Sequence, residues 1–413
     1  MKIAVLMNLH SPWSQNICVE LSRQKIIIDV FYVDSKRQKT YIEKNMPGIE
    51  RLSKNVRGIY SLNSSDRGLL NYLTASIKFK KYCGAPPTGV GGTSIASSGG
   101  TLRSTSPFAE ATEGLPFSRS SPSRSLGHSA KEGKKNKYDL ALTLYGGGLS
   151  AIAYLSGVRP YAIYFVGSDV NKSNNIKSVA NKIICRSALK VFTNGEELAN
   201  QVRRKFKRPD VDIFLNSIDI KFFSRKSKKD ISVICTRGFL SFYNNQYLIE
   251  ALKFIDEEKI KKIVFTAGGP ELDKVKVFAK KTLPKKIFKK IDFLGGVPHQ
   301  AMADLLSRSQ IFVSVSKSDG ISTSLLEAMS AGTYPVVSDI SANRLLINEI
   351  SKNGTVVSFD QPKKLANSIN LILDNKKIQS QAAMTNLKII KKDFDIQKNI
   401  RGLIKNLKKT ELS

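Results

Sequence analysis

The stretch from Ile311 to Ser338 constrains the fold most strongly, because it reads as a strand, a polar loop, a short helix and a second strand. Ile311 to Val315 is rich in β-branched residues, as in a buried strand. The polar run from Ser316 to Ser324 follows, and helix formers begin at Leu325. In open parallel sheets, ligands bind beyond the carboxyl ends of strands, where helix N-termini offer free N–H groups. We therefore expect an anionic ligand here, close to Gly320.

The same alternation of strands and helices extends along most of the chain and predicts an α/β fold with parallel sheets. At about 100 to 200 residues per domain, 413 residues suggest two domains. We place an N-terminal Rossmann-like domain at 1–220, a second domain at 221–375 and a basic helical tail at 376–413. The charged run from Lys221 to Asp230 is interpreted as a linker. Predicted strands cover 2–7, 26–33, 140–144, 161–166, 190–193, 211–215, 231–235, 262–267 and 291–294.

A formal charge of +32, from 66 basic and 34 acidic residues, indicates either a polyanionic partner or lysine spread over every solvated face. An anionic membrane surface is the expected partner, since each basic residue near such a surface contributes about 1 kcal/mol. Nucleic acid is not expected, because the chain lacks an aromatic and basic recognition motif. The expected location is the cytoplasm, peripheral to the inner face of the cytoplasmic membrane.

Cysteine and histidine usage argues against metal chemistry. The four cysteines lie far apart without CxxC spacing, and the three histidines form no HExxH pair. We expect no metal and no cofactor. No apolar run approaches the ~20 residues that span a bilayer, and the N-terminus lacks a signal-peptide pattern.

From Gly84 to Ala130 the composition changes to Gly, Ser, Pro and Thr, without a lysine or an asparagine. Such a segment buries too little apolar surface to order itself, so we interpret it as a disordered insertion. An RNA-binding Arg/Ser segment is the alternative.

Two glycine-containing turns of the first domain are expected at one sheet edge. Gly146 and Gly147 follow one strand, and Ser168 and Asp169 follow the next. These turns either admit a sugar or phosphate or are simply tight connections.

Two carboxylates lie in the stretch from Ile311 to Ser338: Asp319 follows the predicted strand, and Glu327 lies in the predicted helix. Ser324 and Glu327 have the spacing of a capping box, which needs no ligand. Alternatively, Glu327 accepts hydrogen bonds from a ribose while the amides from Thr323 to Leu325 meet a diphosphate.

The sequence SKSDGISTSLLEAMSAGTYPVVSD resembles the donor-site signature of retaining glycosyltransferase family four, in its SDGxSxSLLEAM subgroup. LNSIDIKFF at 215–223, VICTRGFLSFYNNQYLIEAL at 233–252 and FLGGVPHQAMADLLSRSQIFVSVS at 293–316 are similar to other landmarks of that family. The resemblance covers both domains apart from the low-complexity segment. It implies a GT-B fold, in which two Rossmann-like domains with parallel sheets face each other across a cleft and a C-terminal helix crosses back to the first domain.

The resemblance also implies site residues. Arg237 would meet the diphosphate of a nucleotide-diphosphate sugar and act in catalysis with Asp319, and Asp169 would serve on the acceptor side. Asn244 or Asn245 stands where the family usually has a lysine, Asp319 replaces the commoner Glu, and Ser168 departs from a family His. Implied donor-binding residues are Arg237, Asn244, Asp319, Gly320, Ile321, Ser322, Thr323, Ser324, Leu325 and Glu327, and implied acceptor-binding residues are Gly146, Gly147, Ser168 and Asp169.

The implied reaction transfers a sugar, with its anomeric configuration retained, to a surface polysaccharide or a lipid-linked glycan. The alternative is a catalytically impaired nucleotide-sugar-binding protein of the same fold.

Overall fold

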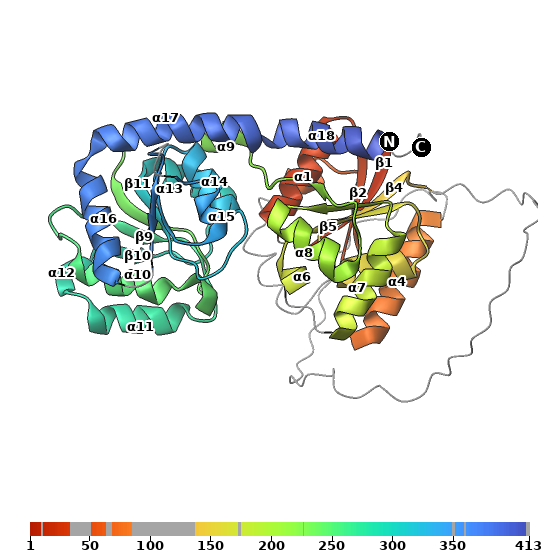
Figure 1. The fold of residues 1–413 in the computed structure, drawn as a ribbon, viewed down its shortest axis with the longest axis horizontal. Helices are drawn as coiled ribbons and strands as arrows, with labels where there is room; N and C mark the ends of the chain where they lie inside the picture. Colours follow the sequence, from red (N-terminus) through yellow and green to blue (C-terminus); the bar gives the residue numbers. More distant parts are fainter. Residues whose placement is uncertain are drawn as a thin grey trace, which may run out of the picture.

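The computed structural model describes residues 1–9, 11–33, 51–62, 68–84, 137–171, 175–225, 227–348, 352–358 and 361–409. Apart from Gly84, the predicted low-complexity insertion lies outside these residues. Figure 1 shows two α/β domains side by side, with the last helices running along both. Within the described residues, no helix has the length and apolar character needed to cross a membrane.

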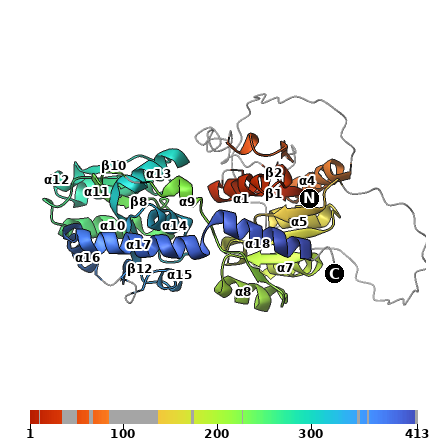
Figure 2. The same ribbon diagram turned by 90° about the horizontal axis from the view of Figure 1, so that it is seen from above.

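The first domain is built on a seven-stranded parallel sheet with the order β3-β2-β1-β4-β5-β6-β7. Helices cover both of its faces (Figure 2). Its strands are β1 Lys2–Leu6, β2 Ile27–Tyr32, β3 Gly58–Ser61, β4 Leu140–Thr143, β5 Tyr161–Phe165, β6 Lys190–Thr193 and β7 Asp212–Ile213. Its helices are α1 Pro12–Arg23, α4 Gly68–Gly84, α5 Gly148–Leu155, α6 Ser168–Asn171, α7 Asn175–Ser187 and α8 Glu196–Phe206.

The second domain has a six-stranded parallel sheet with the order β10-β9-β8-β11-β12-β13. Its strands are β8 Ile231–Cys235, β9 Ile263–Phe265, β10 Ile291–Phe293, β11 Ser309–Ser314, β12 Tyr334–Ser338 and β13 Thr355–Val357. Its α-helices are α9 Ile220–Phe223, α10 Asn245–Ala251, α11 Leu272–Thr282, α12 Lys285–Phe288, α13 His299–Arg308, α14 Thr323–Ser330, α15 Ser341–Arg344, α16 Pro362–Asp374 and α17 Lys376–Asp393. Short 3₁₀ helices are η1 Ser241–Tyr243 and η2 Leu252–Phe254.

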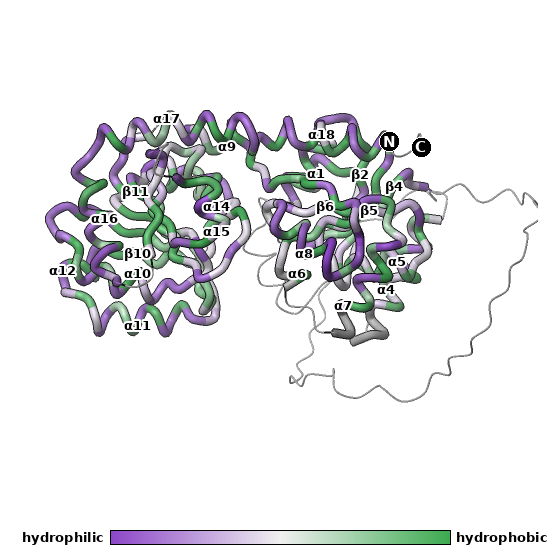
Figure 3. The backbone as a smooth tube through the Cα atoms, in the orientation of Figure 1, coloured by the Kyte–Doolittle hydropathy of each residue, from purple (hydrophilic) through white to green (hydrophobic). Residues whose placement is uncertain are grey.

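Local sequence signals explain the elements that were predicted closely. The bounds of helix α8 follow from its end residues: Glu196 and Glu197 lie in its first turn, and basic residues in its last turn complement the helix dipole. Strand β11 consists of buried or half-buried residues, as its β-branched composition predicts. Figure 3 shows mainly hydrophobic strands enclosed by helices in which hydrophilic and hydrophobic residues alternate. Side-chain periodicity and the residues at the ends therefore predict an element when its bounds depend only on neighbouring residues.

Two chain crossings join the domains. The first is the segment that leads into α9, and the second is the passage from α17 to α18, Ile396–Lys409. They pair with each other, because Ile218 N donates to Phe394 O (3.0 Å) and Ile396 N donates to Ile218 O (3.1 Å). Helix α18 then packs on the first domain beside α1 through the buried residues Ile396, Ile400, Leu403 and Leu407. Burying each of these side chains contributes about 1.5 to 3 kcal/mol, so α18 is firmly held.

The run from Lys221 to Asp230 is not a simple linker as expected. It begins inside α9, where Asp219 caps the helix by accepting from Phe222 N (3.2 Å). Phe223 is fully buried in the core of the second domain. Burial of this aromatic residue fixes the start of the second domain ahead of its first strand.

Candidate functional site

The candidate donor loop, residues 315–322, lies at the carboxyl edge of the second sheet. It follows β11 and precedes α14, and β11 pairs with β8. Because β8 lies between β9 and β11, this edge is the topological switch point, where ligands bind in open parallel sheets. Arg237 follows β8, so the topology alone brings it to the donor loop.

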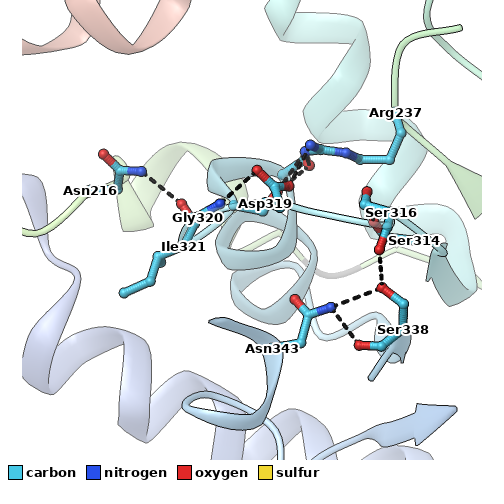
Figure 4. A network of polar contacts seen from close by, with 11 residues as sticks. Asn216, Arg237, Ser314, Ser316, Asp319, Gly320, Ile321, Ser338 and Asn343 are labelled. Atoms are coloured by element: carbon cyan, nitrogen blue, oxygen red, sulfur yellow. Dashed lines mark hydrogen bonds and ion pairs between the residues drawn. The ribbon is translucent and has the colours of Figure 1, made fainter. Parts of the chain in front are cut away.

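Arg237 holds the donor loop and the first turn of α14 through three side-chain contacts. Its Nη1 donates to Ser322 Oγ (2.6 Å) and Ser324 Oγ (2.8 Å), and its Nη2 donates to Asp319 Oδ2 (2.5 Å). Figure 4 shows the guanidinium directed at Asp319. Tyr243 packs on the other side, with the guanidinium carbon 4.1 Å from its ring centroid. A planar guanidinium is suited to this arrangement, in which several acceptors and an aromatic face are used together.

The ion pair between Arg237 and Asp319 is largely shielded from solvent. The side chains of Arg237 and Asp319 are only 9% and 22% exposed. Burial raises the pKa of the Asp319 carboxyl above its ordinary value, and the Arg237 guanidinium and the Gly320 N–H oppose the rise. Arg237 Nε is buried and has no acceptor among the described residues. The site therefore retains a charged donor with capacity for an additional acceptor such as a phosphate oxygen.

Helix α14 begins two residues earlier than the helix formers suggest, and the predicted capping box is wrong. Ser322 is the N-cap in an extended conformation, and its carbonyl accepts from Leu325 N and Leu326 N (both 3.1 Å). The hydroxyl of Ser324 is instead bound by Arg237. The amides of Thr323 and Ser324 have no acceptor in the described part of the chain. Together with the helix dipole, they form an anion-binding end.

Glu327 is therefore not explained by helix capping. Its Oε1 lies 3.6 Å from Nε2 of His299, the first residue of α13. His299 stacks on Phe222 with ring centroids 4.7 Å apart, and its Nε2 is buried with no hydrogen-bond partner among the described residues. Glu327 remains 15% exposed, so its carboxylate is available to hydroxyl donors of a ligand.

Residues from the first domain and the interdomain segment contact the donor loop. Asn216 Nδ2 donates to Ile321 O (2.7 Å), as Figure 4 shows. Asn216 Oδ1 accepts from the Tyr164 hydroxyl (3.1 Å), which comes from the core of the first domain. Asn194, after β6, lies so close to Gly320 that a Cβ there would be 3.4 Å from its Nδ2. The carboxyl edges of the two sheets therefore face each other at this loop.

A second polar group supports the loop from below. Ser338 Oγ donates to Ser316 O (2.7 Å), and Asn343 Nδ2 donates to Ser338 O (2.8 Å). All three residues are buried, and Figure 4 shows them below and to the right of Asp319. They tie the ends of β11 and β12 to α15, so the base of the donor loop is rigid.

On the first domain, the structure brings together the two predicted glycine turns. Asp169 Oδ2 accepts from Gly146 N (2.8 Å), and Oδ1 accepts from Gly167 N (2.9 Å) and Val166 N (3.1 Å). Burial raises the pKa of the Asp169 carboxyl, and these N–H groups oppose the rise. Gly147 has a φ of 67°, which favours glycine, and Ser168 opens α6. Asp169 thus fastens the candidate acceptor loops together.

Asn244 and Asn245 have different positions. Asn244 is left-handed, with a φ of 56°, between η1 and α10. Asn245 is buried, and its Nδ2 donates to Gly238 O (3.0 Å) and Arg237 O (3.4 Å). The structure therefore places Asn245, rather than Asn244, against the backbone that carries Arg237.

Sequence reasoning missed Tyr243, the part played by His299 and the bridge made by Asn216. His299 lies inside the FLGGVPHQ landmark and Asn216 inside LNSIDIKFF, so the motifs marked both positions without their contacts. Tyr243 lies inside the landmark at 233–252, which likewise gave no indication of its contact with Arg237. Within the described residues, no three His, Cys, Asp or Glu side chains are grouped as a metal site would require.

Residues 216–388 match the model of the family described as glycosyl transferases group 1. Comparison with curated proteins gives no match. Solved structures similar to the whole chain include HepE of Anabaena in complex with UDP-glucose, at 13% identity and a TM-score of 0.68, covering 99% of this chain and 100% of that one. A glycosyltransferase from Rickettsia africae has 12% identity and a TM-score of 0.67, with 99% and 98% covered.

A mutant of S. aureus TarM, in complex with Fondaparinux, alpha-GlcNAc-glycerol and UDP, has 12% identity and a TM-score of 0.66, with 98% of this chain and 99% of that one covered. At these identities the structural likeness establishes the fold. The chain has the GT-B fold, and the match of residues 216–388 to glycosyl transferases group 1 together with this fold supports a glycosyltransferase.

Proposed function

We propose that the protein transfers a sugar, with its anomeric configuration retained, from a nucleotide-diphosphate sugar to a polysaccharide or lipid-linked glycan. One observation carries the proposal: Arg237, the free amides of α14 and Glu327 converge at the switch point of the second sheet. A positive side chain and a helix N-terminus suit a diphosphate, and a carboxylate one turn further suits ribose hydroxyls.

In the proposed mechanism, the bond between the anomeric carbon and the diphosphate breaks while negative charge develops on the departing group. Arg237 and the amides of Thr323 and Ser324 stabilise that charge without reorganising, because the loop already holds them in position. Asp319 and the amides from Gly320 to Ser322 orient the transferred sugar. Because these groups supply the neutralisation, the proposed reaction requires no metal, and activity should persist in EDTA.

The acceptor side of the proposal is carried by the loops that Asp169 joins. They lie at the carboxyl edge of the first sheet, on the side that meets the donor loop. Gly146 and Gly147 offer close backbone approach for a sugar hydroxyl. The +32 charge supports an acceptor presented at an anionic membrane surface inside the cell.

The test is a screen of nucleotide-diphosphate sugars for hydrolysis or transfer, followed by calorimetric titration with the matching nucleotide. UDP is the first candidate, because HepE and TarM structures contain it. Glu327→Ala should weaken nucleotide binding, while the control Asp273→Ala, which removes a 96% exposed carboxylate on α11, should not. If no nucleotide diphosphate binds at millimolar concentration, the proposed activity is wrong.

The alternative is a nucleotide-sugar-binding protein without turnover. It is favoured by Asp319 in place of Glu and by asparagines in place of a lysine beside the diphosphate. Nucleotide binding with no transfer to any acceptor in cell extracts would support this alternative.

A further inference from the structure

Three helices of the first domain form one outer layer. Helix α5 packs between α4 and α7, and Figure 2 shows the three in this order. Their inner faces supply core residues such as Phe79, Ile152 and Ile184. Their outer faces are turned away from the sheet.

These outer faces carry an unusual number of exposed apolar side chains. Ile77 is 69% exposed, Val179 is 59% exposed and Ile183 is 49% exposed. Leu155 and Leu73 add 47% and 40%. Single exposed apolar residues are common, but a group on neighbouring helices marks an interaction surface. We call the outer faces of α4, α5 and α7 the outer helical layer.

The charge of the outer helical layer specifies what it fits. Helices α4, α5 and α7 contain no Asp or Glu, whereas about three would be present at the average of the whole chain. Lys80 and Lys81 are exposed on α4 beside Ile77, and Arg186 is exposed on α7 beside Ile183. On these three helices every charged residue is basic. Exposed apolar side chains with basic neighbours match an anionic bilayer, into which apolar groups insert while basic groups meet the headgroups.

The layer also begins at the candidate acceptor loop. Gly148 opens α5, and a Cβ on this residue would lie 2.6 Å from the Tyr72 ring of α4. Tyr72 is 37% exposed and therefore lies at the border between the acceptor loop and the layer. An acceptor anchored in a bilayer would reach the loop from this side.

We propose that the outer helical layer docks the protein on an anionic lipid bilayer, with Ile77, Val179 and Ile183 inserted at the headgroup boundary. The inference rests on the proposed function only where it makes the acceptor lipid-linked. Docking itself is measured without any sugar transfer, so failure of the two proposals can be told apart.

The test is sedimentation of the full chain with vesicles of phosphatidylglycerol and phosphatidylcholine, compared with vesicles of phosphatidylcholine alone. Wild type should bind the anionic vesicles. Lys80→Gln with Lys81→Gln should weaken binding about 25-fold, at about fivefold for each lost basic residue. Ile77→Glu and Ile183→Glu should each weaken it about tenfold. Both positions are exposed, so folding should be unaffected.

The matched control is Val277→Glu on α11, because Val277 is also 69% exposed and lies among lysines of the second domain. It should leave vesicle binding unchanged. Equal weakening by Ile77→Glu and Val277→Glu would overturn the proposal in favour of general charge attraction. Loss through the lysine variants alone, with equal binding to an RNA homopolymer, would overturn it in favour of a nucleic-acid surface.

A second experiment tests whether the chain itself covers the outer helical layer. The segment after α4 lies outside the described residues, and residues 86–130 can be deleted. Deletion should leave vesicle affinity within about threefold, which is below the effect expected for one basic residue. A gain of tenfold or more would show that this segment occupies the layer and would overturn bilayer docking as its role.

Discussion

Replacing Arg237 by Lys tests whether the site needs a positive charge or a guanidinium. The native side chain reaches Ser322, Ser324 and Asp319 at 2.6, 2.8 and 2.5 Å while lying on Tyr243. A lysine ammonium is a point charge on a flexible stem and cannot occupy all four contacts at once. Hydrogen bonds to charged groups contribute about 1.5 to 3 kcal/mol each. Losing one or two of them predicts a loss of about 2 to 4 kcal/mol.

In kinetic terms, that loss corresponds to a decrease of about 30-fold to 1000-fold in kcat/KM. The assay is steady-state transfer with the donor found by screening, together with thermal unfolding to separate loss of function from loss of stability. Arg308→Lys is the control, because Arg308 pairs with Asp230 at the surface, where the two side chains are 44% and 45% exposed. An exposed pair contributes about 0 to 1 kcal/mol, so this control should retain its activity. If Arg237→Lys stays within threefold of wild type, guanidinium geometry is not what the site requires.

Three further changes test contacts outside Arg237. Asn216→Asp removes the amide N–H group that lies 2.7 Å from Ile321 O and sets a carboxylate against that carbonyl. The affinity for the sugar nucleotide should therefore fall about tenfold, at about 1 to 2 kcal/mol, while the KM for the acceptor stays unchanged. Equal changes in both KM values would contradict an effect on the donor loop. Asp169→Asn should lower the unfolding free energy by about 1 to 3 kcal/mol, because it removes the carboxylate that accepts from Gly146 N and Gly167 N. A loss of sugar transfer without a loss of stability in urea titration would instead indicate a catalytic carboxylate. Partial burial lowers the pKa of Lys229 from 10.5 to about 8, so below pH 8 the folded protein bears a half-buried charge, and stability rises as the pH increases from 8 to 10.5. Lys229→Met should therefore raise the unfolding free energy at pH 7 by up to about 3 kcal/mol and by much less above pH 10; a variant no more stable at pH 7 would show that nearby carbonyls offset the burial.

Local sequence determined the elements that depend on neighbouring residues. The strand before Ser316, the left-handed Gly332 with a φ of 66° after α14, and the bounds of α8 all follow from side-chain period, dihedral preference and end charges within a few positions. Parallel topology then follows from the order of these elements, and it brings Arg237 and the donor loop to one sheet edge.

Only the tertiary structure decided how the donor loop is held. Read locally, Ser324 and Glu327 have the spacing of a capping box, but Arg237, 87 positions away from Ser324, binds the Ser324 hydroxyl, and α14 begins at Thr323 with Ser322 as its N-cap. The bridge from Asn216 to Ile321 O spans 105 positions and likewise has no local signal. The physical reason is that a polar side chain has several partners of similar energy, and packing of the two domains selects among them.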